Sequence, residues 1–150
     1  MVRAGYPSAK EPVGLLRTDG KRPDGLTLIP WRAGRSLVWD VTVTDTLAAS
    51  YLSNTSRTAG AVAEMAAAWK NTKYTQIAMV HHFVPLACET MGPVSDEGMA
   101  FLLSLGQNLT AMSGDARETS YLFQRLSVTI QRFNAVAFRG SFPALVFNDD

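Results

Sequence analysis

The segment from Ser36 to Thr44 constrains the fold most strongly, because its side chains alternate between two faces as those of a β-strand do. One face would carry Leu37, Trp39, Val41 and Val43, and the other Val38, Asp40 and Thr42. Asp40 thus interrupts a face that Val38 begins as apolar, and burying an unpaired carboxylate is costly. We therefore expect a strand in a sheet and a partner for the Asp40 carboxylate.

The rest of the chain predicts a hairpin and several helices. Leu26 to Trp31 would form the first hairpin strand, with the turn at residues 32–35. The other predicted elements are a short strand over Val13 to Leu16, a turn-rich segment from Thr18 to Pro23, a short helical turn ending at Leu52, a helix from Ser56 or Thr58 to about Gln76, an edge or bulged strand from His82 to Thr90, a helix from Ser95 to Gly114, and a last helix that begins with a capping box at Asp115 to Glu118 and runs to about Arg139. This order predicts a mixed α/β domain.

Helical spacing predicts which sides of these helices are buried. The first long helix would bury the stripe Val62, Met65, Ala66, Trp69 and Ile77, the second Phe101, Leu102, Leu105, Leu109 and Met112, and the last Leu122, Leu126, Ile130, Phe133 and Ala137. Lys70 lies one turn from Ala66 and Ala67, whose small side chains would allow another backbone to approach closely. The last stripe is expected to be core, or a surface for a further protein segment.

Composition indicates an ordinary globular domain. The 150 residues suit one domain, and 47% hydrophobic with 18% charged residues excludes a disordered chain. The net charge of +1 gives no overall attraction to nucleic acid, so such binding would need a local patch. The single cysteine, Cys88, the lack of a signal-peptide pattern and the lack of a bilayer-length apolar run predict an intracellular, non-secreted protein without a membrane segment.

Two carboxylates and two lysines carry the most distinctive chemistry. Asp24 and Asp40 are separated by enough chain for one strand to turn and return, so both acids can reach one end of a hairpin. Lys70 and Lys73 are neighbours on a helix surface, where a shared anion would offset their repulsion. Mg²⁺ prefers one or two carboxylates plus waters and substrate oxygens. The set can therefore hold a divalent metal and support phosphodiester hydrolysis.

Ordinary structural roles fit the same residues when each is taken alone. Pro23-Asp24-Gly25 is a common turn former. Lys73 can lie over Trp69 while its amine stays in water, and Lys70 can be a solvated surface residue.

Four motifs together resemble a known nuclease family. They are Arg22-Pro23-Asp24, Asp40-Val41-Thr42-Val43, Lys70-x-x-Lys73-Tyr74, and Val84-Pro85-Leu86 followed by Gly92. In order and spacing they resemble the restriction-like endonuclease domain of non-LTR retrotransposons, over the range from about Glu11 to Gly92. The resemblance implies the PD-(D/E)XK nuclease fold, a small mixed sheet flanked by helices.

The resemblance also implies a function and a site. Asp24 and Asp40 would be ligands of Mg²⁺ or Mn²⁺ in an enzyme that nicks target DNA. The wider superfamily has a lysine two residues after the second acid, where this chain has Thr42. In the retrotransposon branch that lysine lies on the following helix, so Lys73 and Lys70 are the candidates. Lys73 is preferred because Tyr74 adjoins it.

The same resemblance divides the chain and suggests its partners. It gives a loose N-terminal segment (1–10), an endonuclease core (11–92), a C-terminal helical pair (93–141) and a tail (142–150). The acid-bearing helix that normally opens the fold is expected to be missing, with Glu11 as the nearest substitute acid. The implied partners are DNA and an upstream reverse transcriptase region, with a nuclear location if active and no small-molecule cofactor.

Other candidate residues have weaker patterns. Arg125 and Arg132, with Arg139, recur every seven residues and could follow a phosphate backbone together with Arg22, although a solvated helix face is the more common arrangement. His81 and His82 would point to opposite faces of a strand, and Cys88 is expected to be a buried structural thiol. The alternative left open is a catalytically inactive remnant that binds nucleic acid or packs against a partner.

Overall fold

The computed structural model describes residues 1–15 and 20–141, and within them one sheet has the strand order β1-β2-β3-β4. The strands are β1 (Ser8–Lys10), β2 (Gly25–Arg32), β3 (Arg35–Thr44) and β4 (His82–Glu89). Both β1 with β2 and β2 with β3 pair antiparallel, whereas β3 and β4 are parallel. The mixed α/β class is therefore confirmed, and β4 is an edge strand as its proline favours.

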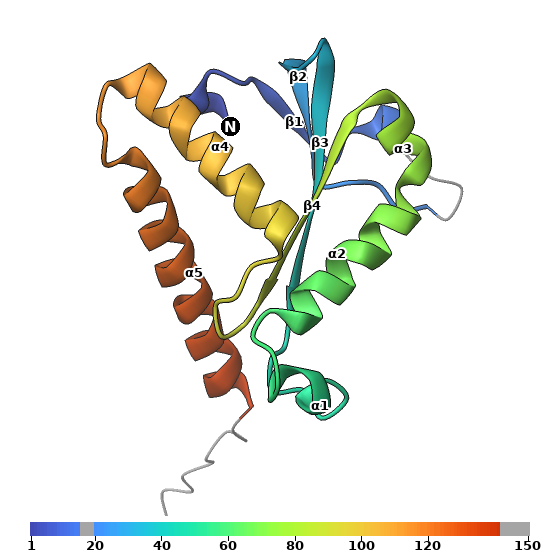
Figure 1. The fold of residues 1–150 in the computed structure, drawn as a ribbon, viewed down its shortest axis with the longest axis vertical. Coiled ribbons are helices and arrows are strands. Elements are labelled where there is room, and N and C mark those ends of the chain that lie inside the picture. The colour runs from blue at the N-terminus through green and yellow to red at the C-terminus, as the bar shows by residue number, and fades with distance from the viewer. Residues whose placement is uncertain (16–19, 142–150) are drawn as a thin grey trace, which may run out of the picture.

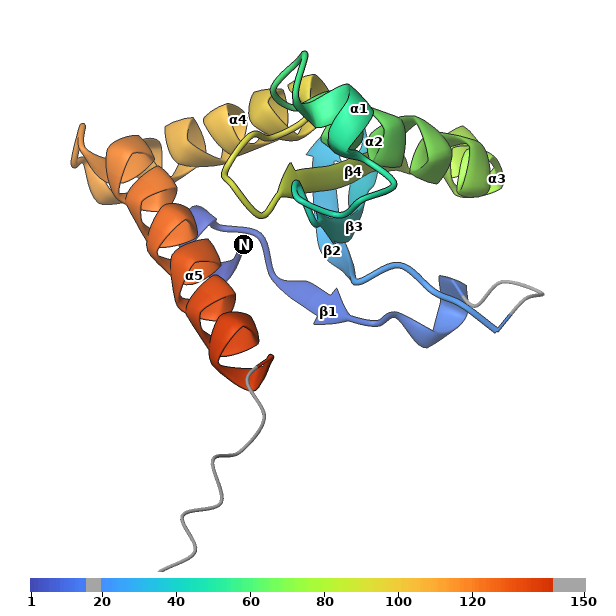
Figure 2. The ribbon, with the colours of Figure 1, turned by 90° about the horizontal axis from the view of Figure 1, so that it is seen from below.

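Helices cover both faces of this sheet. The helices are α1 (Leu52–Thr55), α2 (Ala61–Lys73), α3 (Thr75–Val80), α4 (Asp96–Ser113) and α5 (Glu118–Gly140). The parallel pair needs a crossover, which α1, α2 and α3 supply on one face. On the other face lies α4, with α5 packed against it (Figures 1 and 2). In the described part of the chain, none of these helices has the length and apolar content that crossing a membrane requires.

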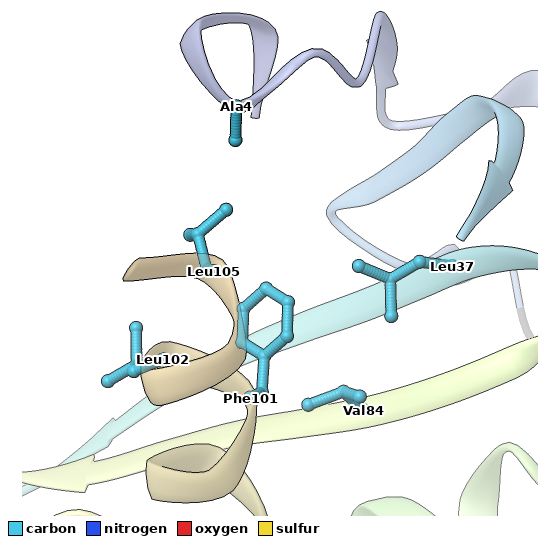
Figure 3. Close-up of a cluster of buried hydrophobic side chains, with 6 residues drawn as sticks. All are labelled: Ala4, Leu37, Val84, Phe101, Leu102 and Leu105. Carbon is cyan, nitrogen blue, oxygen red and sulfur yellow. The ribbon is translucent and has the colours of Figure 1, made fainter. Parts of the chain in front are cut away.

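The alternation predicted for β3 is confirmed, and it divides the core in two. Leu37 faces α4 within a cluster that also contains Ala4, Val84, Phe101, Leu102 and Leu105 (Figure 3). Val38 faces α2 and α3 in a second cluster with Tyr74 and Phe83. Asp40 follows Val38 by two positions, so it lies on the α2 face of the sheet.

The predicted hairpin is present, with a tighter turn than expected. Arg32 pairs with Arg35, so only Ala33 and Gly34 form the connection. Their φ angles are 47° and 73°, both positive, as a two-residue type I′ turn requires. The strands are therefore each slightly longer than the apolar pattern indicated.

The N-terminal region differs from the prediction. Residues 1–10, expected to be loose, contain a 3₁₀ turn (Val2–Ala4) and the strand β1. The strand predicted from Val13 is wrong, because Val13–Leu15 is a 3₁₀ turn. The remaining part of that strand and the predicted turn at Thr18 and Asp19 fall within residues 16–19, which lie outside the described residues. The predicted tail (142–150) also lies outside them.

The long helix predicted to run to Gln76 is divided. Helix α2 begins after Gly60, whose φ of 83° is left-handed, and ends where Tyr74 leaves helical geometry. The predicted apolar stripe is wrong at Met65 and Trp69, which are 52% and 59% exposed. The helix instead buries its small residues, with Ala63 and Ala67 packed on Ala87 of β4. Their size allows the close approach to the sheet, so packing distance decides the rotation of α2.

The two C-terminal helices agree better with the sequence. Ser95 caps α4 by accepting the Gly98 N–H, and Gly114 ends it, as predicted. The predicted burial is wrong at Met112 of α4, which is 65% exposed, and at Phe133 of α5, which is 67% exposed. The predicted capping box is wrong, because the Asp115 carboxylate accepts from the backbone and guanidinium of Arg117, which begins α5 without a side-chain cap.

Gly25 gives the first testable consequence of this packing. A Cβ added there would lie 2.0 Å from Cζ2 of Trp39. We expect Gly25→Ala to lower the free energy of unfolding by about 1–3 kcal/mol, measured by urea denaturation, because the ring must move. Gly14→Ala, where no atom of the described residues lies within 4 Å of the added atom, is the matched control. Equal stability of the two variants would contradict the close contact between β2 and Trp39.

Candidate functional site

Asp40 lies beneath α2, and two residues of this helix region contact its carboxylate. The residue is only 4% exposed. Lys70 Nζ forms an ion pair with Asp40 Oδ2, and the Tyr74 hydroxyl donates to Asp40 Oδ1 at 3.2 Å. The expectation that Asp40 needs a partner is confirmed.

The phase of α2 explains which residues reach Asp40. Ala63, Ala67, Lys70 and Tyr74 follow one another at spacings of four, three and four residues, so they form one stripe on the side facing the sheet. The Tyr74 ring is buried and packs on Phe83 with 4.9 Å between ring centroids. This packing holds the hydroxyl at the carboxylate.

The two candidate lysines are placed differently. Lys70 contacts Asp40, and its side chain is 15% exposed. Lys73 Nζ lies 5.3 Å from the ring centroid of Trp69 and 4.8 Å from that of Tyr74. The geometry therefore favours Lys70 over Lys73, which the sequence had preferred. In the sequence Tyr74 adjoins Lys73, but its four-residue spacing from Lys70 is the signal that Lys70 and Tyr74 share a helix face.

Asp24 lies beside β3, next to the position of Asp40. It immediately precedes β2, whose first residue, Gly25, pairs with Trp39 of β3. The Asp24 carboxylate accepts the backbone N–H of Val41 at 2.5 Å, and its own N–H donates to the Trp39 carbonyl at 3.1 Å. The Asp24 carboxylate therefore binds the residue that follows Asp40 on β3, while Lys70 of α2 binds Asp40 itself.

The metal donors available at this site are the carboxylates of Asp24 and Asp40. Within residues 1–15 and 20–141, no three or more His, Cys, Asp or Glu side chains form a group that could hold a metal ion. Two carboxylates nonetheless suffice for Mg²⁺, which completes its shell with waters and substrate oxygens. Each ionised carboxylate has about four acceptor positions, so the hydrogen bonds described above leave capacity. Asp24 and Asp40 thus fit Mg²⁺ or Mn²⁺.

A groove of about 450 Å³ opens beside this site. Its lining consists of Thr42, Thr44, Tyr51, Val62, Met65, Ala66, Trp69 and Lys70. Thr42 and Thr44 follow Asp40 on the same face of β3, and Lys70 joins the groove to the acids. Among the described residues, no hydrogen-bond partner is found for the buried Thr42 hydroxyl. Sequence reasoning did not predict this groove.

The three predicted arginines are placed differently. Arg22 forms an exposed ion pair with Glu11 at 3.2 Å, which places the candidate third acid on that arginine. Arg125 and Arg132 are exposed on α5, which packs on α4, and the sheet separates α4 from the Asp40 face (Figure 1). The structure does not bring these two arginines to the site.

The remaining candidates keep structural explanations. Cys88 is half-buried, and burial raises the pKa of its thiol, which reduces its thiolate fraction. His82 begins β4, and burial lowers the pKa of its imidazole, with Arg32 as the next cause. His81 precedes the strand. We find no shared site for these residues in the part of the chain that the structure describes.

Glu89 is an important residue that the sequence did not reveal. Its side chain is fully buried. Oε1 accepts the backbone N–H groups of Val62 and Ala63 at 3.0 and 3.4 Å, and Oε2 accepts the Thr46 hydroxyl at 3.4 Å. The start of α2 has no side-chain cap of its own, so Glu89 supplies one from β4. This cap fixes the helix that carries Lys70.

Comparisons with known proteins add no assignment. No protein-family model matches the chain, and no curated protein matches its sequence at a significant level.

Proposed function

We propose that the chain is a metal-dependent DNA endonuclease of the restriction-like type associated with non-LTR retrotransposons, which nicks target DNA by phosphodiester hydrolysis. The observation that supports this most is the pair of contacts on β3, where Lys70 of α2 binds Asp40 and the Asp24 carboxylate, just before β2, binds the N–H of the adjoining Val41. A mixed sheet flanked by helices also accords with a PD-(D/E)XK fold. DNA, an upstream reverse transcriptase region and a nuclear location belong to the same proposal.

The position of the lysine gives further support. The superfamily lysine would stand two residues after the second acid, on the same face of the strand. Here Thr42 has that position, and Lys70 reaches the same face from α2, where both line one groove. An amine from the helix thus replaces an amine from the strand, as the resemblance implies for this branch.

The residues have separate roles in the proposed reaction. Asp24 and Asp40 would hold Mg²⁺ or Mn²⁺, which when bound supplies charge neutralisation at the phosphate and a water of lowered pKa. The Lys70 amine lies at the Asp40 carboxylate, where it would stabilise the extra negative charge that develops on the phosphate oxygens. Tyr74 is a positioning residue, because its hydroxyl orients the Asp40 carboxylate.

A plasmid-nicking assay tests the proposal. We expect conversion of supercoiled to open-circular DNA with Mg²⁺ or Mn²⁺, none with EDTA, and a loss of about 100-fold or more in rate for Asp40→Asn. Asp96→Asn makes the same chemical change at an exposed position in the first turn of α4 and should leave the rate unchanged. Metal-independent nicking, or an Asp40→Asn rate equal to wild type, would defeat the proposal.

The alternative of a catalytically inactive module has its own observation. Helix α5 exposes the apolar side chains of Val128, Phe133, Val136 and Phe138 by 60–67% each, as a helix that packs on another protein segment would. The same alternative treats the ion pair of Asp40 and Lys70 as purely structural. Salt-dependent DNA binding that Arg125→Ala and Arg132→Ala weaken, without any nicking, would favour it over the endonuclease.

A further inference from the structure

We infer that the groove beside Lys70 binds an unpaired nucleobase of the DNA strand whose phosphate is held at Asp24, Asp40 and Lys70. This inference rests on the proposed endonuclease function, since it names the form of DNA that the same site would accept. Two observations support it: the direction of the groove, and the aromatic side chain and amines at its edge.

The groove begins at the proposed reaction site. Its floor is Thr42 and Thr44, which continue the face of β3 that carries Asp40. Alternate residues of a strand lie roughly 7 Å apart, so Thr42 stands about one nucleotide away from the carboxylate. A nucleotide whose phosphate lies at Asp40 and Lys70 would therefore direct its base along this floor.

The edge of the groove has the side chains that bind nucleotides. Trp69 is 59% exposed, although an indole ring is usually well covered by packing. The amines of Lys70 and Lys73 lie 5.7 and 5.3 Å from its ring centroid. Proteins that bind single strands use this combination, with bases stacked on aromatic rings and phosphates near cations.

The shape of the groove also decides the form of the DNA. Bases in a duplex are stacked and paired inside the helix, so a base reaches a lateral groove only when it is unpaired or extruded. A volume of about 450 Å³ lies within the range of small-ligand sites. The occupant we propose is therefore a single-stranded or locally unpaired segment rather than continuous duplex.

Binding of fluorescently labelled oligonucleotides tests the inference. Fluorescence anisotropy in EDTA would compare a short single strand, the duplex of the same sequence, and a strand of equal length made of abasic sites. We expect the single strand with bases to bind at least about five-fold more tightly than the abasic strand. Equal binding of the strand with and without bases would overturn the inference, because the contacts would then be to phosphate alone.

Variants of the groove locate the contact. Trp69→Leu removes the ring and should weaken single-strand binding about five-fold or more, whereas Trp69→Phe keeps a stacking ring and should lose less. Phe133→Ala, at a comparably exposed aromatic residue of α5, is the matched control and should change nothing.

The outcomes separate this inference from the endonuclease proposal. If the protein nicks plasmid DNA, but Trp69→Leu and Trp69→Phe bind the single strand as tightly as the wild type does, the groove inference is overturned and the nuclease proposal stands. Base-dependent binding that Trp69→Leu weakens, without nicking under any metal, would keep the groove and defeat the nuclease. Thermal unfolding of each variant shows whether the folded protein is being compared.

Discussion

Replacing Lys70 with methionine is expected to lower the free energy of unfolding by about 3–5 kcal/mol. Methionine has a similar length and keeps the contacts of the stem, but it leaves the Asp40 carboxylate buried without its cation. Breaking a buried pair by removing one partner is strongly destabilising for this reason. Urea denaturation of wild type and Lys70→Met measures the difference.

A double-mutant cycle shows whether this loss belongs to the pair. Asp40→Asn keeps the shape of the side chain and an acceptor for Tyr74, so Asp40→Asn with Lys70→Met should be more stable than the sum of the single changes predicts, by about 0.5–3 kcal/mol. Arg22→Met is the control, because Arg22 and Glu11 are both more than a third exposed and solvent screening limits such pairs to at most about 1 kcal/mol. Strict additivity of the single changes at 40 and 70 would contradict the ion pair.

Glu89→Ala is expected to cost about 2–4 kcal/mol of unfolding free energy. The change leaves the N–H groups of Val62 and Ala63 without their buried acceptor and opens a cavity between β4 and α2. Glu89→Gln keeps an acceptor oxygen and loses only the charge at the helix N-terminus, so it should cost about 1 kcal/mol. Denaturant unfolding followed by far-ultraviolet circular dichroism measures both.

The control for Glu89 is another acidic residue at a helix start. Glu97 lies in the first turn of α4, is exposed, and accepts from Asn71 at 2.9 Å. Glu97→Ala should therefore cost under about 1 kcal/mol. A Glu89→Ala variant no less stable than Glu97→Ala would contradict the role of Glu89 as the buried cap of α2.

The strand part of the site was predictable from the sequence, for a simple reason. Alternation has a period of two, so Asp40 could be placed on the face of Val38 without knowledge of the rest of the fold. Its burial then required a partner. The hairpin also followed, because the apolar runs on both sides of the turn are long and regular.

The helix part was not predictable in the same way, since each residue turns the helix by about 100 degrees and the choice of lysine depends on its rotation. The sequence offered Met65 and Trp69 as the buried stripe because they are large and apolar. The structure buries Ala63 and Ala67 instead. With α2 rotated in this way, Lys70 reaches the Asp40 carboxylate and Trp69 lies at the groove.

Other features depended on contacts between distant segments. β1 has only three residues and no apolar pattern, and its identity comes from pairing with β2. Glu89 caps α2 through Val62 and Ala63, which precede it in the sequence by 27 and 26 positions. No local sequence motif indicates a contact over such a separation. Helix α5 was predicted to bury an apolar stripe, yet Phe133 in that stripe is exposed. Helical spacing identifies an apolar stripe but does not tell whether the stripe contacts a core or solvent.

The alanine contact between α2 and β4 has a consequence for how this chain can vary. Ala63, Ala67 and Ala87 have no reactive group, yet the methyl-to-methyl spacing between them fixes how far the amine stands from the acid. A bulkier side chain at any of the three would push α2 away from β4 and increase the distance between Lys70 Nζ and the Asp40 carboxylate. These three alanines should therefore tolerate fewer substitutions than the exposed Trp69, although they have no reactive group.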